Sequence, residues 1–315
     1  MIGKLHPDEL KKYVLQYRGA ENKDLLSGPS IGEDSAVIKR TNSKYLLVSS
    51  DPIVGAANKN IGKFLVEINV NDIAAKGGDP KYIMLNILVP ENLGKPFIKK
   101  TMKDIDESCK KYGISIIGGH TEITQKHKKP FLTATIIGES NKLFSIKNVK
   151  KDDLLLLIGN PALEGTYILY NAHKEKLTNL LTKEEKKEIN TYINQLSVYN
   201  YSKIVRKYSK YMHDPTEGGI WGGLSEIDDL LPNLGVTFKD NISLPSPVKK
   251  ITDYFGINPL KLISSGALLA IASKTKKKDL INKLKSSNYP YTLIGSIEKS
   301  SDFKRDYTEK LWDYL

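Results

Sequence analysis

Five short segments of this chain combine an acidic residue with glycine or other small residues. They read GEDSA (residues 32–36), SSDP (49–52), NVND (69–72), GGHTE (118–122) and HDPTEGG (213–219). The chain as a whole is strongly basic, with a formal net charge of +12. Carboxylates that gather at one place need a counter-ion to hold them together. The series therefore indicates a candidate site for a cation and an anionic ligand.

Asp72 is the most informative of these acidic residues. Ile61, Leu65 and Ile68 precede it at helical spacing, so the next position on that stripe should be apolar. A carboxylate there is costly unless it is paired or bound to a metal. A buried cap or salt bridge is the alternative explanation. Asn71, its neighbour, could add a neutral oxygen ligand or contact a nucleotide.

Asp34 and Asp51 extend this hypothesis. Asp34 comes just before a predicted strand over residues 35–39, and Asp51 comes just after the next one, over 45–50. Either aspartate alone is an ordinary turn residue. Together with Asp72 they favour a hard divalent cation such as Mg²⁺, which bridges a few carboxylates to substrate phosphates.

The GGHTE segment follows a predicted strand over residues 114–117. We interpret Gly118 and Gly119 as a turn that brings backbone N–H groups close to a phosphate. His120 and Glu122 then offer a base or a ligand. A plain turn capped by Thr121 explains the same residues.

HDPTEGG has a similar character. His213 and Asp214 precede a proline turn, and Gly218 and Gly219 open a predicted helix that reaches residue 230. A helix N-terminus attracts anions, so this loop is expected to face a phosphate or a phosphorylated intermediate. The single cysteine, Cys109, lies on an apolar helical stripe, where core packing is the better explanation.

The elements that carry these segments predict a mixed α/β (α+β) protein. Expected strands, rich in β-branched and aromatic residues, cover residues 35–39, 45–50, 82–89, 114–117, 131–137, 154–158, 267–272 and 291–294. Expected helices cover residues 60–76, 97–112, 163–172, a long polar stretch over 183–208, 218–230 and 276–285. A polar stretch at 140–153 predicts two domains, residues 1–145 and 146–315.

Composition excludes several classes of protein. No stretch approaches the length of a membrane span, and the N-terminus lacks the order of a signal peptide, so we expect a cytoplasmic protein without a membrane partner. The basic residues are mostly lysines in scattered pairs and triplets, which favours a solvated surface over nucleic-acid binding. The sequence contains neither a GxxxxGK[ST] phosphate loop nor a cysteine–histidine cluster for zinc.

Taken in order, the five segments resemble the aminoimidazole ribonucleotide (AIR) synthetase superfamily, also called PurM-like. The extended forms NVNDIAAKGGDP (69–80), GGHTEIT (118–124), HDPTEGGIWGGL (213–224) and SSGALLAIAS (264–273) carry the resemblance across both halves. Members include the cyclo-ligase PurM, thiamine-monophosphate kinase and the hydrogenase maturation protein HypE. The style of HDPTEGG is nearest to HypE, although this sequence ends in Trp312, Asp313, Tyr314 and Leu315 without the cysteine that HypE proteins carry there.

The resemblance implies an N-terminal ATP-binding domain whose strands form a barrel across a homodimer, and a C-terminal α/β domain that closes the cleft. It implies ATP and Mg²⁺ as cofactors. Asp34, Asp51 and Asp72 would hold metal and phosphate, and Asp214 would reach them from the second domain as a further ligand. Asp214 and His213 are the candidate catalytic residues.

The remaining site residues follow from the same match. Gly118, Gly119, His120, Thr121 and Glu122 would border the nucleotide, together with Gly218, Gly219 and Asn71. Thiamine-monophosphate kinases have an aspartate where this chain has His120.

We therefore expect ATP-dependent phosphoryl transfer, HypE-like in sequence, to a small-molecule or protein-borne acceptor. The alternatives are a small-molecule kinase similar to thiamine-monophosphate kinase, and a nucleotide-binding regulatory or scaffold protein without catalysis.

Overall fold

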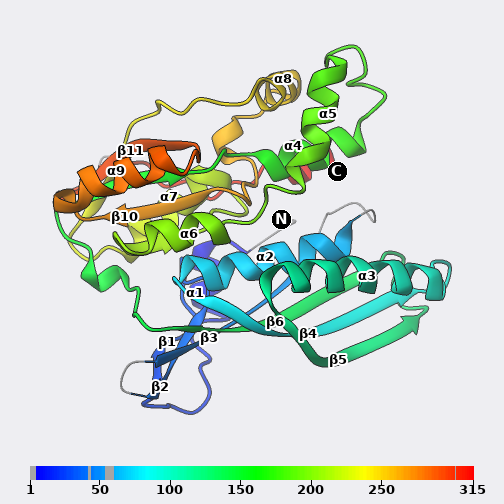
Figure 1. Ribbon diagram of the computed structural model, residues 1–315, viewed down its shortest axis with the longest axis horizontal. Helices are drawn as coiled ribbons and strands as arrows, with labels where there is room; N and C mark the ends of the chain where they lie inside the picture. The colour runs from blue at the N-terminus through cyan, green and yellow to red at the C-terminus, as the bar shows by residue number, and fades with distance from the viewer. Residues whose placement is uncertain (1–4, 42–43, 54–59, 302) are drawn as a thin grey trace.

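Two β-sheets, each built from a consecutive part of the chain, organise the molecule (Figure 1). The computed structural model describes residues 5–41, 44–53, 60–301 and 303–315. The first sheet has the order β1-β2-β3-β6-β4-β5, in which only β4 and β5 run parallel. Its strands are β1 (Leu25–Ser27), β2 (Ala36–Thr41), β3 (Lys44–Ile53), β4 (Asp79–Pro90), β5 (Ser115–Thr124) and β6 (Phe131–Ser140).

Two helices cover one face of the first sheet, α2 (Ile61–Ala75) and α3 (Gly94–Tyr112) (Figure 1). Alternate residues of β4 point toward them, so that Ile83, Leu85 and Ile87 are buried. Almost all of α2 is buried, because it also packs against elements of the second domain. This position explains why α2 is apolar on nearly every side and how it can hold a side chain between the two domains.

The second sheet is antiparallel, with the order β8-β10-β7-β11-β9. Its central strand, β7, is a run of leucines and isoleucine that is buried along its whole length. The strands are β7 (Leu154–Ile158), β8 (Ser209–His213), β9 (Gly235–Phe238), β10 (Leu268–Ala272) and β11 (Tyr291–Glu298). The helices around it are α4 (Leu163–Ala172), α5 (Lys183–Tyr192), α6 (Tyr199–Val205), α7 (Gly219–Leu230), α8 (Ser246–Phe255) and α9 (Lys277–Ser286).

The ends of the chain meet the second domain. Helix α1 (Pro7–Tyr13) begins at the N-cap His6, whose side chain accepts a hydrogen bond from the backbone N–H of Asp8. After β11 the chain runs without a strand or an α-helix through residues 303–315, and it has only a short 3₁₀ turn at Leu311–Tyr314. No helix in the described parts of the chain is both long and apolar enough to cross a membrane.

The mixed α/β class predicted from the sequence is confirmed, and most elements lie where the patterns placed them. The prediction of one long helical stretch over residues 183–208 is wrong, since α5 ends at Tyr192 and α6 begins at Tyr199. Between them the backbone finds partners in α2, because Leu196 accepts a hydrogen bond from the side chain of Asn71 and Val198 donates one to it, each 2.8 Å long.

Candidate functional site

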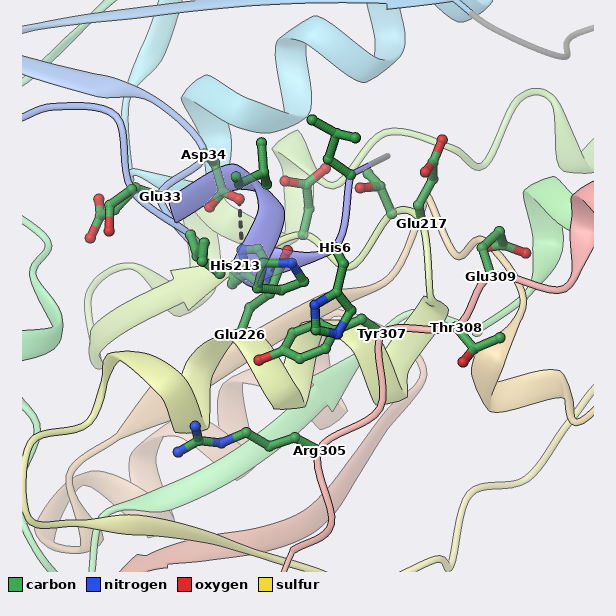
Figure 2. A pocket seen from close by; sticks show the side chains of 18 of the residues that line it. His6, Glu33, Asp34, His213, Glu217, Glu226, Arg305, Tyr307, Thr308 and Glu309 are labelled. Carbon is green, nitrogen blue, oxygen red and sulfur yellow. Dashed lines mark hydrogen bonds and ion pairs between the residues drawn. The ribbon is translucent and has the colours of Figure 1, made fainter. Parts of the chain in front are cut away.

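A cavity of about 960 Å³ lies between the two domains (Figure 2). Its lining comes from the GEDSA loop, β3 and α2 on one side and from the β8–α7 loop on the other. Helix α1 and the C-terminal segment, residues 303–315, complete the wall. Segments far apart in sequence therefore share one enclosed space.

Four predicted aspartates, Asp34, Asp51, Asp72 and Asp214, all line this cavity. Asp72 projects from α2, is 5% exposed, and accepts a hydrogen bond of 2.6 Å from the hydroxyl of Ser49. Burial raises the pKa of Asp72 well above its usual value, and the charges of Asp51, Asp214 and Asp34 raise it further. The helical stripe correctly predicted a carboxylate in a buried position.

Asp214 is in the same electrostatic situation on the other side of the cavity. It is 2% exposed, and burial together with the charges of Asp34 and Asp51 raises its pKa well above the usual value, against the opposing charge of His213. One carboxyl oxygen of Asp214 and one of Asp34 are buried without a hydrogen-bond partner. Such oxygens are rare in folded proteins, and here they leave two acceptors for a ligand in the cavity.

These residues fit Mg²⁺ by the chemistry of their oxygens. Among the described residues, however, no three His, Cys, Asp or Glu side chains are grouped so as to hold a metal ion on their own. Mg²⁺ commonly keeps several waters and binds through one or two carboxylates plus substrate phosphates. The arrangement therefore suits a metal that arrives with a phosphate-bearing ligand.

His213 lies between two carboxylates. Its Nδ1 is 2.6 Å from Asp34 Oδ1, and its Nε2 is 2.7 Å from Glu226 Oε2 (Figure 2). Burial alone would lower the pKa of His213, but Asp34 and Glu226 raise it to about 10. The ring is thus held as an imidazolium with both nitrogens donating. It balances carboxylate charge and ties the GEDSA loop to α7, and it has no nitrogen left to accept a proton as a base.

Two further contacts fix the GEDSA loop. The ammonium group of the buried Lys76, at the end of α2, lies 2.7 Å from the carboxylate of Glu33. The hydroxyl of Tyr211 donates to the carbonyl oxygen of Gly32. Asp34 is therefore positioned from α2 on one side and from β8 on the other.

The prediction that GGHTE forms a turn is wrong, because these residues lie inside strand β5. Gly118 and Gly119 have φ angles of 149° and 140°, and a Cβ atom on Gly119 would lie 1.8 Å from the carbonyl oxygen of Leu85. Gly119 is required by the close approach of β5 to β4, next to an irregularity in their register, whereas a Cβ on Gly118 would meet no atom and only its φ angle favours glycine. The glycine pair thus has a structural cause that the sequence alone did not show.

The GGHTE residues are also remote from the aspartates within one chain. Asp51 pairs with Ala134, Ala134 with Leu85, and Leu85 with Gly119. Three strand spacings separate Gly119 from Asp51, or roughly 14 Å. His120 is exposed and bonds only to its neighbour Glu122, at 3.2 Å, while Thr121 is exposed beside them. The position of the aspartate cluster therefore does not test the predicted contact of the GGHTE residues with a nucleotide.

The two α7 glycines and Asn71 have partners inside the chain. The backbone N–H of Gly218 donates to the carboxylate of Glu309 at 2.8 Å, and that of Gly219 donates to the carbonyl of Thr216. Both ends of the Asn71 amide bond to backbone in the α5–α6 connection. The structure therefore gives these three residues packing and capping contacts in the places where the sequence predicted contacts to a nucleotide.

Sequence reasoning missed three contributors to the cavity wall. Glu226 was hidden because only the fold brings it to His213. His6, which belongs to none of the five segments, lies against Tyr307 with the two rings 5.4 Å apart (Figure 2). Glu309 belongs to a segment without a recognisable motif.

The two halves of the chain match the two domains of one known protein family. Residues 32–140 match the family described as AIR synthase related protein, N-terminal domain, and residues 150–308 match its C-terminal domain. Among curated proteins, a putative hydrogenase expression/formation protein of Methanocaldococcus jannaschii is 27% identical over 68% of this chain and 63% of its own length. The thiamine-monophosphate kinase of Pyrococcus horikoshii is 25% identical over 91% of each chain.

Solved structures give the same fold. AaThiL complexed with AMPPCP and TMP superimposes with a TM-score of 0.71 at 18% identity, over 89% of this chain and 90% of that one. The hydrogenase maturation protein HypE in complex with ATP gives a TM-score of 0.66 at 19% identity, over 90% of this chain and 80% of that one.

Proposed function

This chain belongs to the family of AIR synthase related proteins, and on that premise we propose that it is an ATP- and Mg²⁺-dependent phosphoryl-transfer enzyme. The observation that carries the proposal is the group of four aspartates lining one cavity, with buried carboxyl oxygens on Asp34 and Asp214 that lack partners. Like charges in a closed space are stable only with cations. A metal ion that binds together with the nucleotide phosphates would supply this positive charge.

Relatives support the nucleotide. One structure of the same fold is described as complexed with AMPPCP and another as complexed with ATP. Mg²⁺, when bound, would neutralise charge on the phosphates and orient them. Asp34, Asp51, Asp72 and Asp214 are the residues that would hold it. His213 would keep Asp34 in place, so that catalysis is mainly positioning and charge neutralisation.

The acceptor separates two versions of this function. A HypE-like activity is favoured by the motif style and by the hydrogenase-related name of one relative. A small-molecule kinase is favoured by a thiamine-monophosphate kinase that matches along 91% of each chain. His120, in the place of an aspartate, counts against the kinase. We retain the HypE-like version with a protein-borne or small-molecule acceptor.

We further propose that the protein is a homodimer joined through the first sheet. Helices α2 and α3 cover one face of that sheet (Figure 1). Its other face exposes large apolar side chains, among them Tyr82 and Met84 of β4 and Phe131 of β6. The edge strand β5 adds Ile117, which is 50% exposed. Contiguous exposed apolar side chains mark an interaction surface. A partner copy on this face would cover GGHTE, and the predicted role of its residues beside a nucleotide depends on that interface.

Calorimetry and turnover together test the proposed function. ATP should bind in the presence of Mg²⁺ and lose most of its affinity when EDTA removes the metal. Transfer of labelled γ-phosphate to thiamine monophosphate would support the kinase version. ATP consumption only with an added acceptor protein would support the HypE-like version. Absence of ATP binding in the presence of Mg²⁺ would overturn both.

A further inference from the structure

The C-terminal segment follows helix α7 toward its N-terminus and forms the far wall of the cavity. The indole N–H of Trp221 donates to the carbonyl of Lys304 at 3.0 Å, and the backbone N–H of Asp306 donates to the hydroxyl of Ser225 at 2.8 Å. Arg305 bonds to Asp228 on the same helix at 2.7 Å. The segment is thus fixed along α7 before it reaches Glu309.

Glu309 fills the position at the start of α7 where an anion would bind. One carboxyl oxygen accepts the N–H of Gly218 at 2.8 Å, and the other accepts the N–H of Leu311 at 2.7 Å. The N–H of Gly219 is already bonded to Thr216. Helix N-termini favour negative charge, and here the chain provides that charge itself.

The surroundings of Glu309 are unfavourable for a second anion. Burial raises the pKa of Glu309 to about 7, with a further contribution from the charge of Glu217 beside it. Within the described cavity lining, Arg305 and Lys310 are the residues with a permanent positive charge. Arg305 is paired with Asp228 and Asp229, and Lys310 is paired with Asp313 at 3.1 Å.

Other groups in the same cavity indicate that a ligand enters it. Asp34 and Asp214 each keep a buried carboxyl oxygen without a partner, and Asp214 is 2% exposed. At the far wall, the indole N–H of Trp312 is also buried without a partner, and it needs a hydrogen-bond acceptor. A neutral group that carries both an acceptor atom and N–H donors would satisfy the indole and the carboxylates together.

We propose that Glu309 determines specificity, so that the far end of the cavity takes a neutral or cationic nitrogen-bearing group of the acceptor and rejects an anionic one. This inference rests on the proposed function, because it assigns the part of the acceptor that lies away from the transferred phosphate. At the aspartate end, the cavity would then bind negatively charged phosphates together with the metal. At the Glu309 end, it would bind N–H donors of the acceptor.

Two probes of the same shape and opposite charge test the proposal. Benzamidine and benzoate are titrated by calorimetry into the protein saturated with Mg²⁺ and AMPPCP, at about pH 8.5, where Glu309 is ionised despite its pKa of about 7. Benzamidine should bind the unmodified protein at least about tenfold more tightly than benzoate, the difference expected from one charge-assisted contact. Glu309→Gln keeps an oxygen for the N–H of Gly218 but removes the charge, and it should abolish most of that preference. Glu107→Gln, on the exposed face of α3, is the matched control and should preserve it.

A second variant makes the test independent of side-chain shape. Glu309→Ala leaves the N–H of Gly218 available, so benzoate should gain affinity relative to the unmodified protein, provided that circular dichroism shows a cooperative melt. Equal affinities for the two probes, no binding of benzamidine, or an unchanged preference in Glu309→Gln would overturn the inference. Failure of AMPPCP to bind with Mg²⁺ would instead overturn the proposed function, so the two failures are distinguishable.

Discussion

At the scale of single residues, the candidate site consists mainly of carboxylates that the fold buries. The burial of Asp72 was predicted correctly, because three apolar residues at helical spacing lead up to it, and it is 5% exposed. The role of His213 could not be predicted, because its partners lie 179 and 13 residues away in sequence. The turn predicted at Gly119 is wrong, because a glycine needed for strand pairing looks the same in sequence as a glycine in a turn.

Glu164 of α4 gives a pH dependence that is independent of the cavity. It is 3% exposed, one of its carboxyl oxygens has no partner, and burial raises its pKa from 4.5 to about 7. Below pH 4.5 the group is protonated in the folded and the unfolded chain. As pH rises toward 7, only the unfolded chain ionises, so the folded state loses stability.

Glu164→Gln removes this ionisation. Between pH 5 and 8, the free energy of unfolding of the unmodified protein should fall relative to the variant, by most of about 3 kcal/mol. Urea denaturation at the two pH values measures the change. The exposed Glu107→Gln should show no such trend, and a constant difference between the Glu164 variant and the unmodified protein would contradict the assignment.

At the scale of elements, helices α2 and α4 were predicted to within a residue or two, because their apolar patterns and end signals are local. The break between α5 and α6 was not predicted. No proline or glycine marks it, and its backbone is held by Asn71 from the other domain. Strand β8 was also missed, although it places His213 in the lining of the cavity. Long-range contacts, which local patterns do not encode, decide these elements.

The His213 contacts join three elements, the GEDSA loop, β8 and α7. His213→Gln should destabilise the protein by about 3 kcal/mol, because it leaves buried carboxylates without their cation. Adding Glu226→Gln should recover part of that loss, since it removes one of the uncompensated charges. Urea denaturation gives both values.

A second histidine serves as the control for this cycle. His173 bonds to the carbonyl oxygen of Tyr314 at 2.7 Å and lies outside the cavity lining. His173→Gln should cost much less than His213→Gln. Equal costs for the two substitutions, or additive effects of the His213 and Glu226 changes, would show that the imidazolium does not balance the carboxylates.

At the scale of the whole molecule, the two-sheet architecture follows from the sequence, whereas the surface that meets a partner does not. The alternation of residues in β4 shows which side chains face the helices. Its other face carries the apolar residues Tyr82 and Met84, so the sequence alone suggests that this face is buried too. Only the fold shows that no helix of the described chain covers them (Figure 1).

The proposed homodimer predicts a concentration-dependent assembly through this face. Tyr82→Glu should convert the dimer to a monomer in sedimentation equilibrium, because it places a charge within an apolar interface. Tyr254→Glu is the matched control, since Tyr254 of α8 is similarly exposed at 50% but lies on the other domain. A monomeric unmodified protein, or a Tyr82 variant that assembles like the control, would contradict the proposal.

Under the proposed function, the aspartate cluster binds a metal–nucleotide ligand at a cost to the stability of the ligand-free protein. Asp72→Asn should therefore have opposite effects on the ligand-free and the ligand-bound protein. The variant removes a carboxyl group whose ionisation is opposed by burial and by the charges of Asp51, Asp214 and Asp34. Without ligand it should therefore be more stable to heat than the unmodified protein, by several degrees in Tm.

In the same experiment, Mg²⁺ and ATP should raise the Tm of the unmodified protein and leave that of Asp72→Asn unchanged. Asp153→Asn is the matched control, since Asp153 is equally buried but paired with Lys210 at 2.7 Å. It should lose stability without ligand and keep the response to Mg²⁺ and ATP. A ligand-free Asp72 variant that melts below the unmodified protein, or one that responds fully to Mg²⁺ and ATP, would contradict the account.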